Sequence, residues 1–174
     1  MPEMIATATL LDRLAWLYLN QPDDSLIHTL NDAFPELRLR EGDLDAVRQD
    51  YNDLFCVPVS GRYLPPFESA QRAQRLWGPI THHVTDWYLH TGFNPAELHT
   101  SAIWQMQIAP DHIGYELAFY GALLAADSPL AADFYQTHLF TWVPNYARQL
   151  IEKAATPVYR LLGELTLQAL NDDA

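Results

Sequence analysis

Residues 110–126 read PDHIGYELAFYGALLAA, and their apolar side chains recur at helical spacing. Steps of three and four residues place these side chains on one face of a helix. Pro110 stands where a helix tolerates proline, because the first backbone N–H groups of a helix have no intrahelical acceptor. The stretch therefore predicts a helix over 110–126 that turns an apolar face to a core. That face would carry Ile113, Leu117, Tyr120 and Leu124.

The same spacing recurs at 44–55 and 158–165, and no stretch alternates strictly between polar and apolar residues as a strand would. Several prolines follow a capping side chain, as in Ser128-Pro129 and Thr156-Pro157, which is typical of helix starts. We therefore expect an all-α fold, a helical bundle of about ten helices that forms a single domain over residues 1–174. The expected helices cover 5–19, 23–33, 43–55, 68–76, 79–91, 95–106, 110–126, 129–139, 142–154 and 157–170.

Residues 57–67 read VPVSGRYLPPF and interrupt this pattern. Their three prolines and one glycine exclude a regular helix. Because the segment is also apolar and aromatic, we expect it either to pack against the bundle or to await a partner.

The formal net charge is −12, from 22 acidic and 10 basic residues. This balance disfavours nucleic acid as a partner, since a nucleic-acid binder needs a basic surface that displaces counterions. It also disfavours stable association with an anionic membrane. An acidic surface instead attracts a basic partner, or serves solubility alone.

The chain has a single cysteine, Cys56, so it cannot form an internal disulfide. The apolar run from Leu10 to Leu19 is interrupted by Asp12 and Arg13, unlike the apolar region of an export signal. No segment reaches the roughly 18 uncharged apolar residues that suggest a membrane span. These features predict a cytoplasmic protein in which Cys56 is a buried, unreactive thiol.

Asp111, His112 and Glu116 are the polar side chains at the start of the predicted helix 110–126. In a structural interpretation, Asp111 lies in the first turn and complements the positive helix terminus, while His112 and Glu116 form a surface pair. In an enzymatic interpretation, these side chains form an acid–base pair. No nucleophile and no phosphate-binding loop accompanies them, so the enzymatic interpretation has thin support.

His82, Asp86 and His90 recur every four residues on the predicted helix 79–91, a spacing that can place metal ligands on one face. No cysteine pair and no HExxH pattern accompanies them, so a solvated helix face is the favoured interpretation. The sequence therefore predicts neither a metal nor a cofactor.

Four stretches together resemble the TorD/DmsD family of chaperones for molybdenum-cofactor oxidoreductases. The segment PDHIGYEL at 110–117 is similar to the family signature P-D-H-I-x-x-E-L. The others are YNDLF at 51–55, PPFES at 65–69, and HLFTW at 138–142, which is followed by IEKA at 151–154 and PVYR at 157–160. The last group looks most like the DmsD branch. The resemblance covers about residues 44–170, and the order and spacing of the stretches make it specific.

The resemblance implies a TorD-like helical chaperone and not an enzyme. Its expected partner is the twin-arginine signal peptide of a molybdenum-cofactor oxidoreductase, and it would hold the apoenzyme in the cytoplasm until the cofactor is inserted and the enzyme is exported. An arginine pairs well with a carboxylate, and an apolar leader segment fits a groove of aromatic and aliphatic side chains. The expected signal-peptide-binding residues are Asp111, His112, Glu116 and Pro110, with walls from Tyr51, Phe55, Pro66, Ser69 and Trp77.

One departure from the family pattern affects this site. Family members often carry an acid shortly before the P-D-H segment, where this chain has Gln107-Ile108-Ala109. The sequence therefore does not identify which oxidoreductase is the client. It also does not decide the oligomeric state, which is either a monomer or a homodimer that exchanges helices, with hinges at 57–67 or 127–129. Two other functions compete with this one: a helical protein-interaction module without leader specificity, and a small metal-dependent hydrolase.

Overall fold

The computed structural model describes residues 2–106 and 109–171. Within these ranges the fold is all-α, as expected, and strand pairing is limited to an antiparallel bridge between Phe67 and His112. The α-helices are α1 (Pro2–Leu19), α2 (Asp24–Ala33), α3 (Leu44–Tyr51), α4 (Glu68–Ala73), α5 (Pro79–Thr91), α6 (Ala102–Met106), α7 (Ile113–Ala125), α8 (Leu130–Phe134), α9 (Phe140–Lys153) and α10 (Pro157–Asn171). Short 3-10 helices are η1 (Pro35–Leu37), η2 (Glu41–Asp43) and η4 (Pro95–Glu97), and π-helical turns are η3 (Asn52–Cys56) and η5 (Tyr135–Leu139).

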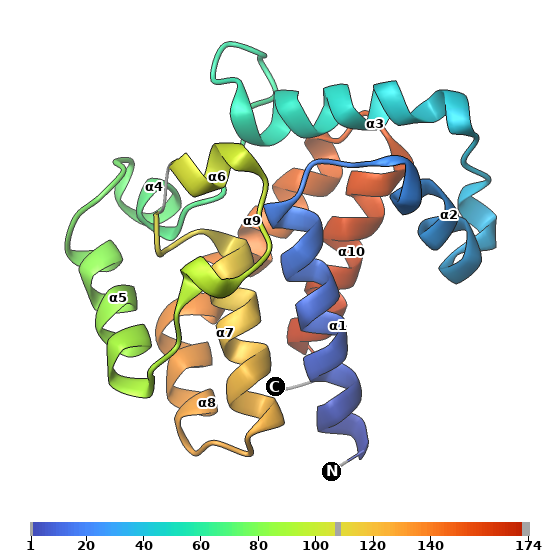
Figure 1. Ribbon diagram of the computed structural model, residues 1–174. Coiled ribbons are helices and arrows are strands. Elements are labelled where there is room, and N and C mark those ends of the chain that lie inside the picture. Colours follow the sequence, from blue (N-terminus) through green and yellow to red (C-terminus); the bar gives the residue numbers. More distant parts are fainter. Residues whose placement is uncertain (1, 107–108, 172–174) are drawn as a thin grey trace.

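Helix α1 forms the centre of the bundle, where it packs against α7 and α10, while α10 packs against α9 (Figure 1). In that view α3 crosses the upper ends of these helices, α2 lies to their right, and α4, α5 and α6 lie to their left. Buried side chains from α1 through α10 join one hydrophobic cluster. The upright helices therefore enclose the core, and the left-hand group forms a separate edge of the bundle.

Two glycines of α7 allow it to approach α1 closely. A Cβ at Gly114 would lie 2.5 Å from Leu19 Cγ and 3.0 Å from the Ala15 carbonyl oxygen. A Cβ at Gly121, two turns further on, would lie 3.3 Å from the Ala8 carbonyl oxygen. The distance between the two helices is therefore set by the absence of side chains at these positions.

The buried Asp50 carboxylate links α3 to the start of α10. Only 1% of Asp50 is exposed, yet the carboxylate accepts hydrogen bonds from the backbone N–H of Thr156 (2.7 Å) and of Ala155 (3.2 Å). The Thr156 hydroxyl donates a further bond of 2.8 Å, and Arg62 forms an ion pair with the same carboxylate. These donors compensate for the burial of the charge. Asp50 therefore fixes the turn that precedes α10.

The predicted helix 95–106 is wrong, because the chain is extended between η4 and α6. Leu98 has extended backbone angles, and Ser101 hydrogen-bonds the end of α1 twice. Its N–H donates to the Leu19 carbonyl at 3.0 Å, and its hydroxyl accepts from the Gln21 N–H at 2.7 Å. These tertiary hydrogen bonds replace the intrahelical ones that the local sequence favours.

Three other boundaries differ from the expected helices. Helix α4 ends at Ala73, and not at residue 76, because Gln74 adopts a left-handed conformation. The predicted break between 139 and 142 is absent, since η5 passes directly into α9. Helix α7 begins at Ile113, after the N-cap residue His112. Pro110 and Asp111 therefore precede the helix and do not form its first turn.

Residues 57–67 form the irregular connection that the sequence predicts, and the two ends of this connection differ. The first part is exposed, with Val59 92% accessible. The second part is packed against the bundle: Leu64, Pro66 and Phe67 are buried, and the Leu64 N–H donates to the Leu54 carbonyl at 2.7 Å. The connection therefore leads into the bridge with His112, where α4 begins.

Candidate functional site

The segment that precedes α7 is tied to the start of α4 by its backbone and by Asp111. The Ile113 N–H donates to the Pro66 carbonyl at 2.8 Å, and the Glu68 N–H donates to the Asp111 carbonyl at 2.9 Å. The Asp111 carboxylate accepts from the Ser69 N–H at 2.8 Å and is 1% exposed. Asp111 therefore caps α4, although the sequence suggested that it would serve its own helix.

His112 is buried and caps α7. Its Nδ1 accepts a hydrogen bond of 3.0 Å from the Gly114 N–H, so the proton of the neutral ring sits on Nε2. The ring lies against Trp104 and Phe67, with centroids 4.6 Å and 5.4 Å away. Burial lowers the pKa of His112 to about 3. The ring is therefore neutral near pH 7, and its Nδ1 is already used.

Three carboxyl groups meet beneath α4, and we call Glu68, Asp111 and Glu116 the acid cluster. Glu68 and Glu116 are both 0% exposed, so the expected surface pair of His112 and Glu116 does not exist. Burial raises the pKa of Glu116 well above its ordinary value, and the neighbouring Glu68 and Asp111 raise it further. Burial and these neighbours therefore favour the neutral, protonated form of Glu116.

Side chains from α4, η5 and α9 bind the carboxyl groups of the acid cluster. Arg72, one turn further along α4, forms an ion pair with Glu68 Oε1. His138 Nδ1 of η5 lies within hydrogen-bond distance of Glu68 Oε2, at 2.7 Å. The indole N–H of Trp142, on α9, donates to Glu116 Oε2 at 3.2 Å. The acid cluster therefore joins α4, α7 and the η5–α9 helix.

The phenol of Tyr88 closes the α5 side of this region. Its hydroxyl donates to the Pro110 carbonyl at 3.0 Å. Burial raises the pKa of Tyr88 well above its ordinary value, and the negative charges of the acid cluster add to this. Tyr88 is therefore a neutral hydrogen-bond donor that fixes the position of half-buried Pro110.

The expected walls Tyr51 and Phe55 lie in the core. The Tyr51 hydroxyl donates to the Tyr18 carbonyl at 2.9 Å and accepts from the Trp104 indole N–H at 2.6 Å. Phe55 packs edge-on against Tyr18, Tyr51 and Tyr159. Through Trp104, Tyr51 connects to His112, so these predicted residues do come together, but inside the protein.

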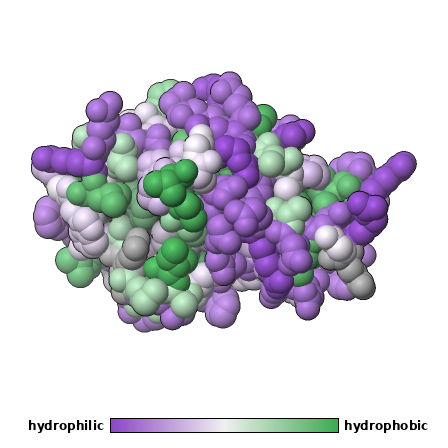
Figure 2. Space-filling model, turned by 90° about the horizontal axis from the view of Figure 1, so that it is seen from above, coloured by the Kyte–Doolittle hydropathy of each residue, from purple (hydrophilic) through white to green (hydrophobic). Residues whose placement is uncertain are grey.

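Of the predicted walls, only Trp77 is exposed. Pro66 and Ser69 are buried, whereas Trp77 is 56% and the adjacent Leu76 51% exposed. Both lie between α4 and α5, in a segment whose backbone is left-handed at Gln74 and again at Trp77. Left-handed backbone is unfavourable for residues with a side chain. Figure 2 shows the larger apolar areas of this face in its left half, which is the half that holds α4–α6 in Figure 1.

Sequence reasoning missed Glu68, Arg72 and His138. Glu68 lies in the PPFES segment and His138 in the HLFTW segment, two of the stretches that carry the family resemblance. Their pairing at 2.7 Å explains why two distant segments belong to one pattern. Arg72 follows Glu68 by four residues within the predicted helix 68–76, a spacing that could have indicated their ion pair.

The other candidate chemistry does not assemble into a site. His82, Asp86 and His90 are exposed on α5, and no three potential metal ligands converge among the described residues. Burial raises the pKa of the Cys56 thiol to about 11, which fits an unreactive thiol. Gln107 and Ile108, where family members often have an acid, lie outside the described residues.

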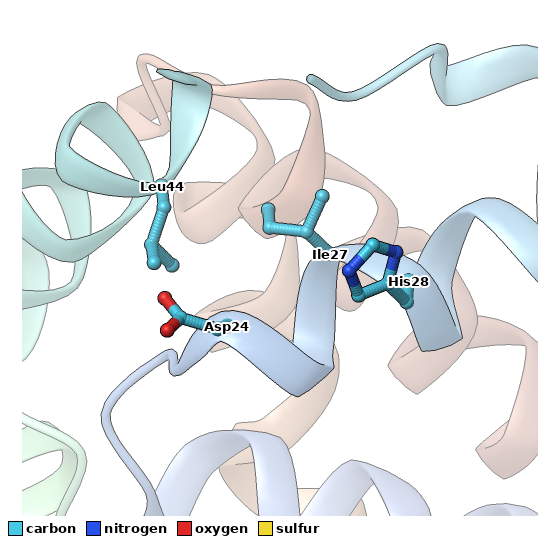
Figure 3. A pocket seen from close by; sticks show the side chains of 4 residues that line it. All are labelled: Asp24, Ile27, His28 and Leu44. Atoms are coloured by element: carbon cyan, nitrogen blue, oxygen red, sulfur yellow. The ribbon is translucent and has the colours of Figure 1, made fainter. Parts of the chain in front are cut away.

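Two surface cavities lie away from the acid cluster. One of about 280 Å³ is lined by Asp24, Ile27 and His28 of α2 and by Leu44 of α3 (Figure 3). The other, of about 320 Å³, lies beside the turn between α7 and α8, where its lining includes Tyr120 and Pro129. Asp24 is 92% exposed in its side chain. The first cavity is therefore a shallow depression, with no buried polar group directed into it.

Known proteins share the sequence pattern and the fold of this chain. The family model for the nitrate reductase delta subunit matches residues 18–148. Among solved structures, the chain is similar to a candidate redox enzyme maturation protein from Archaeoglobus fulgidus, with 18% identity and a TM-score of 0.63 over 95% of this chain and 93% of that chain. At this identity the likeness is one of fold. No protein of curated function matches the sequence.

Proposed function

Because the chain belongs to the nitrate reductase delta subunit family, whose members are redox enzyme maturation chaperones, we propose that it binds the twin-arginine signal peptide of a molybdenum-cofactor oxidoreductase. It would hold the apoenzyme in the cytoplasm until cofactor insertion, and then release it for export. The resemblance to TorD/DmsD chaperones is confirmed at the level of the family, while the DmsD branch stays a prediction. Among the described helices, none has both the length and the apolar character of a membrane span.

The observation that carries this proposal is the exposed pair Leu76–Trp77, which follows Arg72 by four and five residues, while Arg72 itself pairs with Glu68 of the acid cluster. A leader peptide has a basic end followed by an apolar segment. Exposed aromatic side chains supply apolar contact area at low entropic cost and are common among residues that dominate binding energy. Carboxylates that already bind one arginine have the chemistry for another. The segment from α4 to Trp77 therefore offers both halves of the recognition.

The burial of Asp111, His112 and Glu116 supports an indirect part for them in this function. We propose that they hold α4 and the segment after it in the geometry that meets the leader. The enzymatic alternative has little support from the geometry, since His112 is neutral and its Nδ1 caps α7. Glu116 is enclosed, and its raised pKa favours the neutral form.

Calorimetry with a synthetic leader peptide tests the proposal. The peptide carries two adjacent arginines followed by an apolar segment, and a matched peptide carries two lysines. We expect Trp77→Ala to weaken binding of the arginine peptide by at least about tenfold, because loss of a central aromatic contact typically costs 2 kcal/mol or more. Phe140→Ala is the control, since Phe140 is 55% exposed on α9.

Two results would contradict the proposal. Equal affinity for the arginine and lysine peptides would indicate a general charge interaction. Equal capture of the client subunit with and without its leader would indicate a helical interaction module without leader specificity.

A further inference from the structure

The acid cluster is separated from solvent by Arg72. The Glu68 side chain is 0% exposed, whereas the Arg72 side chain is 36% exposed and reaches Glu68 from the next turn of α4. The second hydrogen bond of Arg72 is weak, at 3.4 Å to the Thr137 carbonyl. Arg72 is therefore held mainly by one carboxylate, and its guanidinium lies where the cluster opens to the surface.

The cluster has more hydrogen-bonding capacity than its described neighbours fill. Glu116 Oε1, Ser69 Oγ and His138 Nε2 are buried and find no hydrogen-bond partner among the described residues. Buried polar groups normally have partners, so each of these atoms marks capacity for a further donor or acceptor. Glu68 binds both the guanidinium of Arg72 and the ring of His138. Its carboxylate oxygens suit a ligand that presents several N–H donors.

The segment that carries Arg72 has few constraints after it. Helix α4 ends one residue later, at Ala73, and every side chain from Arg72 to Trp77 is exposed. Gln74 and Trp77 are held in left-handed conformations that cost energy. A change in this segment would release that strain without disturbing the core.

We propose that Glu68, at the edge of the acid cluster, forms a guanidinium subsite, and that Arg72 occupies it as a substitute for an arginine of the client. When the client arrives, its arginine replaces Arg72 at Glu68, Arg72 turns into solvent, and the adjacent Leu76–Trp77 segment is free to cover the apolar part of the leader. The identity of the incoming arginine rests on the proposed function. The subsite itself rests on the contacts of this chain.

Substitutions of the two partners of the ion pair should act in opposite directions. Arg72→Ala removes the resident competitor and should raise the affinity for the arginine leader peptide by about tenfold, the size of one charge-assisted hydrogen bond. Glu68→Gln should lower that affinity by a similar factor. Arg72→Met keeps the apolar stem of the side chain and should raise the affinity as Arg72→Ala does. This variant separates the loss of the charge from the loss of packing.

The matched control is Arg75→Ala. Arg75 is exposed on the same segment and forms no ion pair with any described carboxylate, so its removal changes the net charge equally and should leave the affinity unchanged. If Arg72→Ala and Glu68→Gln both weaken binding, the ion pair is structural and the proposal is overturned.

A second measurement does not depend on the leader. Methylguanidinium at millimolar concentration should raise the melting temperature of Arg72→Ala, because it can refill the vacated subsite. Methylammonium lacks the planar fork of a guanidinium and should not raise the melting temperature of Arg72→Ala. Methylguanidinium should not raise the melting temperature of the wild type or of the Glu68→Gln, Arg72→Ala double variant.

Absence of this stabilisation would overturn the subsite, even if the leader binds. Stabilisation by methylguanidinium together with no leader binding in any variant would instead support the subsite and contradict the proposed function.

Discussion

At the scale of single residues, the Glu116 carboxyl couples a proton to folding. Burial and the neighbouring carboxyls raise its pKa in the folded protein above the value in the unfolded chain. Below the ordinary pKa, both states are protonated and Glu116 causes no pH dependence. Above it, only the unfolded chain releases the proton, so the free energy of unfolding falls as the pH rises.

We expect Glu116→Gln to remove this dependence. Glutamine keeps the shape of the side chain and an acceptor for Trp142, but it does not titrate. The stability of the variant relative to the wild type should therefore increase between pH 5 and pH 8, with a ceiling of about 1.4 kcal/mol per pH unit. Urea denaturation at four pH values measures the difference. A constant difference across this range would mean that Glu116 is ionised in the folded protein.

The burial of His112 and Glu116 could not be predicted from the sequence. The motif identified Asp111, His112 and Glu116 as important, but helical spacing alone placed His112 and Glu116 on the surface. Their burial depends on Phe67 and Trp104, which arrive from other elements. A helix face becomes a surface or an interior only after the chain has folded around it.

At the scale of elements, the contact between α1 and α7 depends on glycine. We expect Gly114→Ala to lower the free energy of unfolding by about 1–3 kcal/mol, because the new Cβ overlaps Leu19 in a filled core. Leu19 is 1% exposed and has no space to move away. Chemical denaturation measures the loss.

Gly121→Ala is the matched comparison on the same helix. Its Cβ would approach the Ala8 carbonyl to 3.3 Å, a smaller intrusion. The higher helix propensity of alanine, up to about 1 kcal/mol, should offset it and leave the stability nearly unchanged. Equal stabilities of the two variants would contradict the role of close packing at Gly114.

Helix positions were predictable where local signals and tertiary contacts agree. The spacing of apolar residues located α7, and Thr156-Pro157 located the start of α10. The expected helix 95–106 was wrong because Ser101 bonds the end of α1, a partner some 80 residues earlier. No local signal reports such a distant hydrogen bond.

At the scale of the whole molecule, the net charge of −12 creates a field that would attract the basic leader proposed above. We expect the association rate with the arginine leader peptide to fall as the ionic strength rises from 0.05 to 0.5 M, because added ions screen charges beyond about 10 Å. The dissociation rate, set by close contacts, should change little. Stopped-flow tryptophan fluorescence measures both rates. An association rate independent of salt would exclude long-range attraction.

The fold class and the family could be read from the sequence, because both depend on patterns spread along the whole chain. The chemistry of the candidate site could not. Glu68 and Arg72 are one turn apart on α4, but His138 lies 66 residues after Arg72, and only the packing of α4 against the η5–α9 helix brings it to Glu68.

The placement of Asp50 has a consequence for how the protein is made. Its backbone donors are Ala155 and Thr156, 105 and 106 residues later in the chain. A ribosome that adds roughly 5–20 residues per second needs roughly 5–20 seconds to supply them. Throughout that interval Arg62 can already pair with the Asp50 carboxylate, but the backbone donors that complete its burial are missing and α3 cannot reach its final position. The nascent chain therefore cannot complete its core from the N-terminus onward, and its final closure waits for the last helix to emerge.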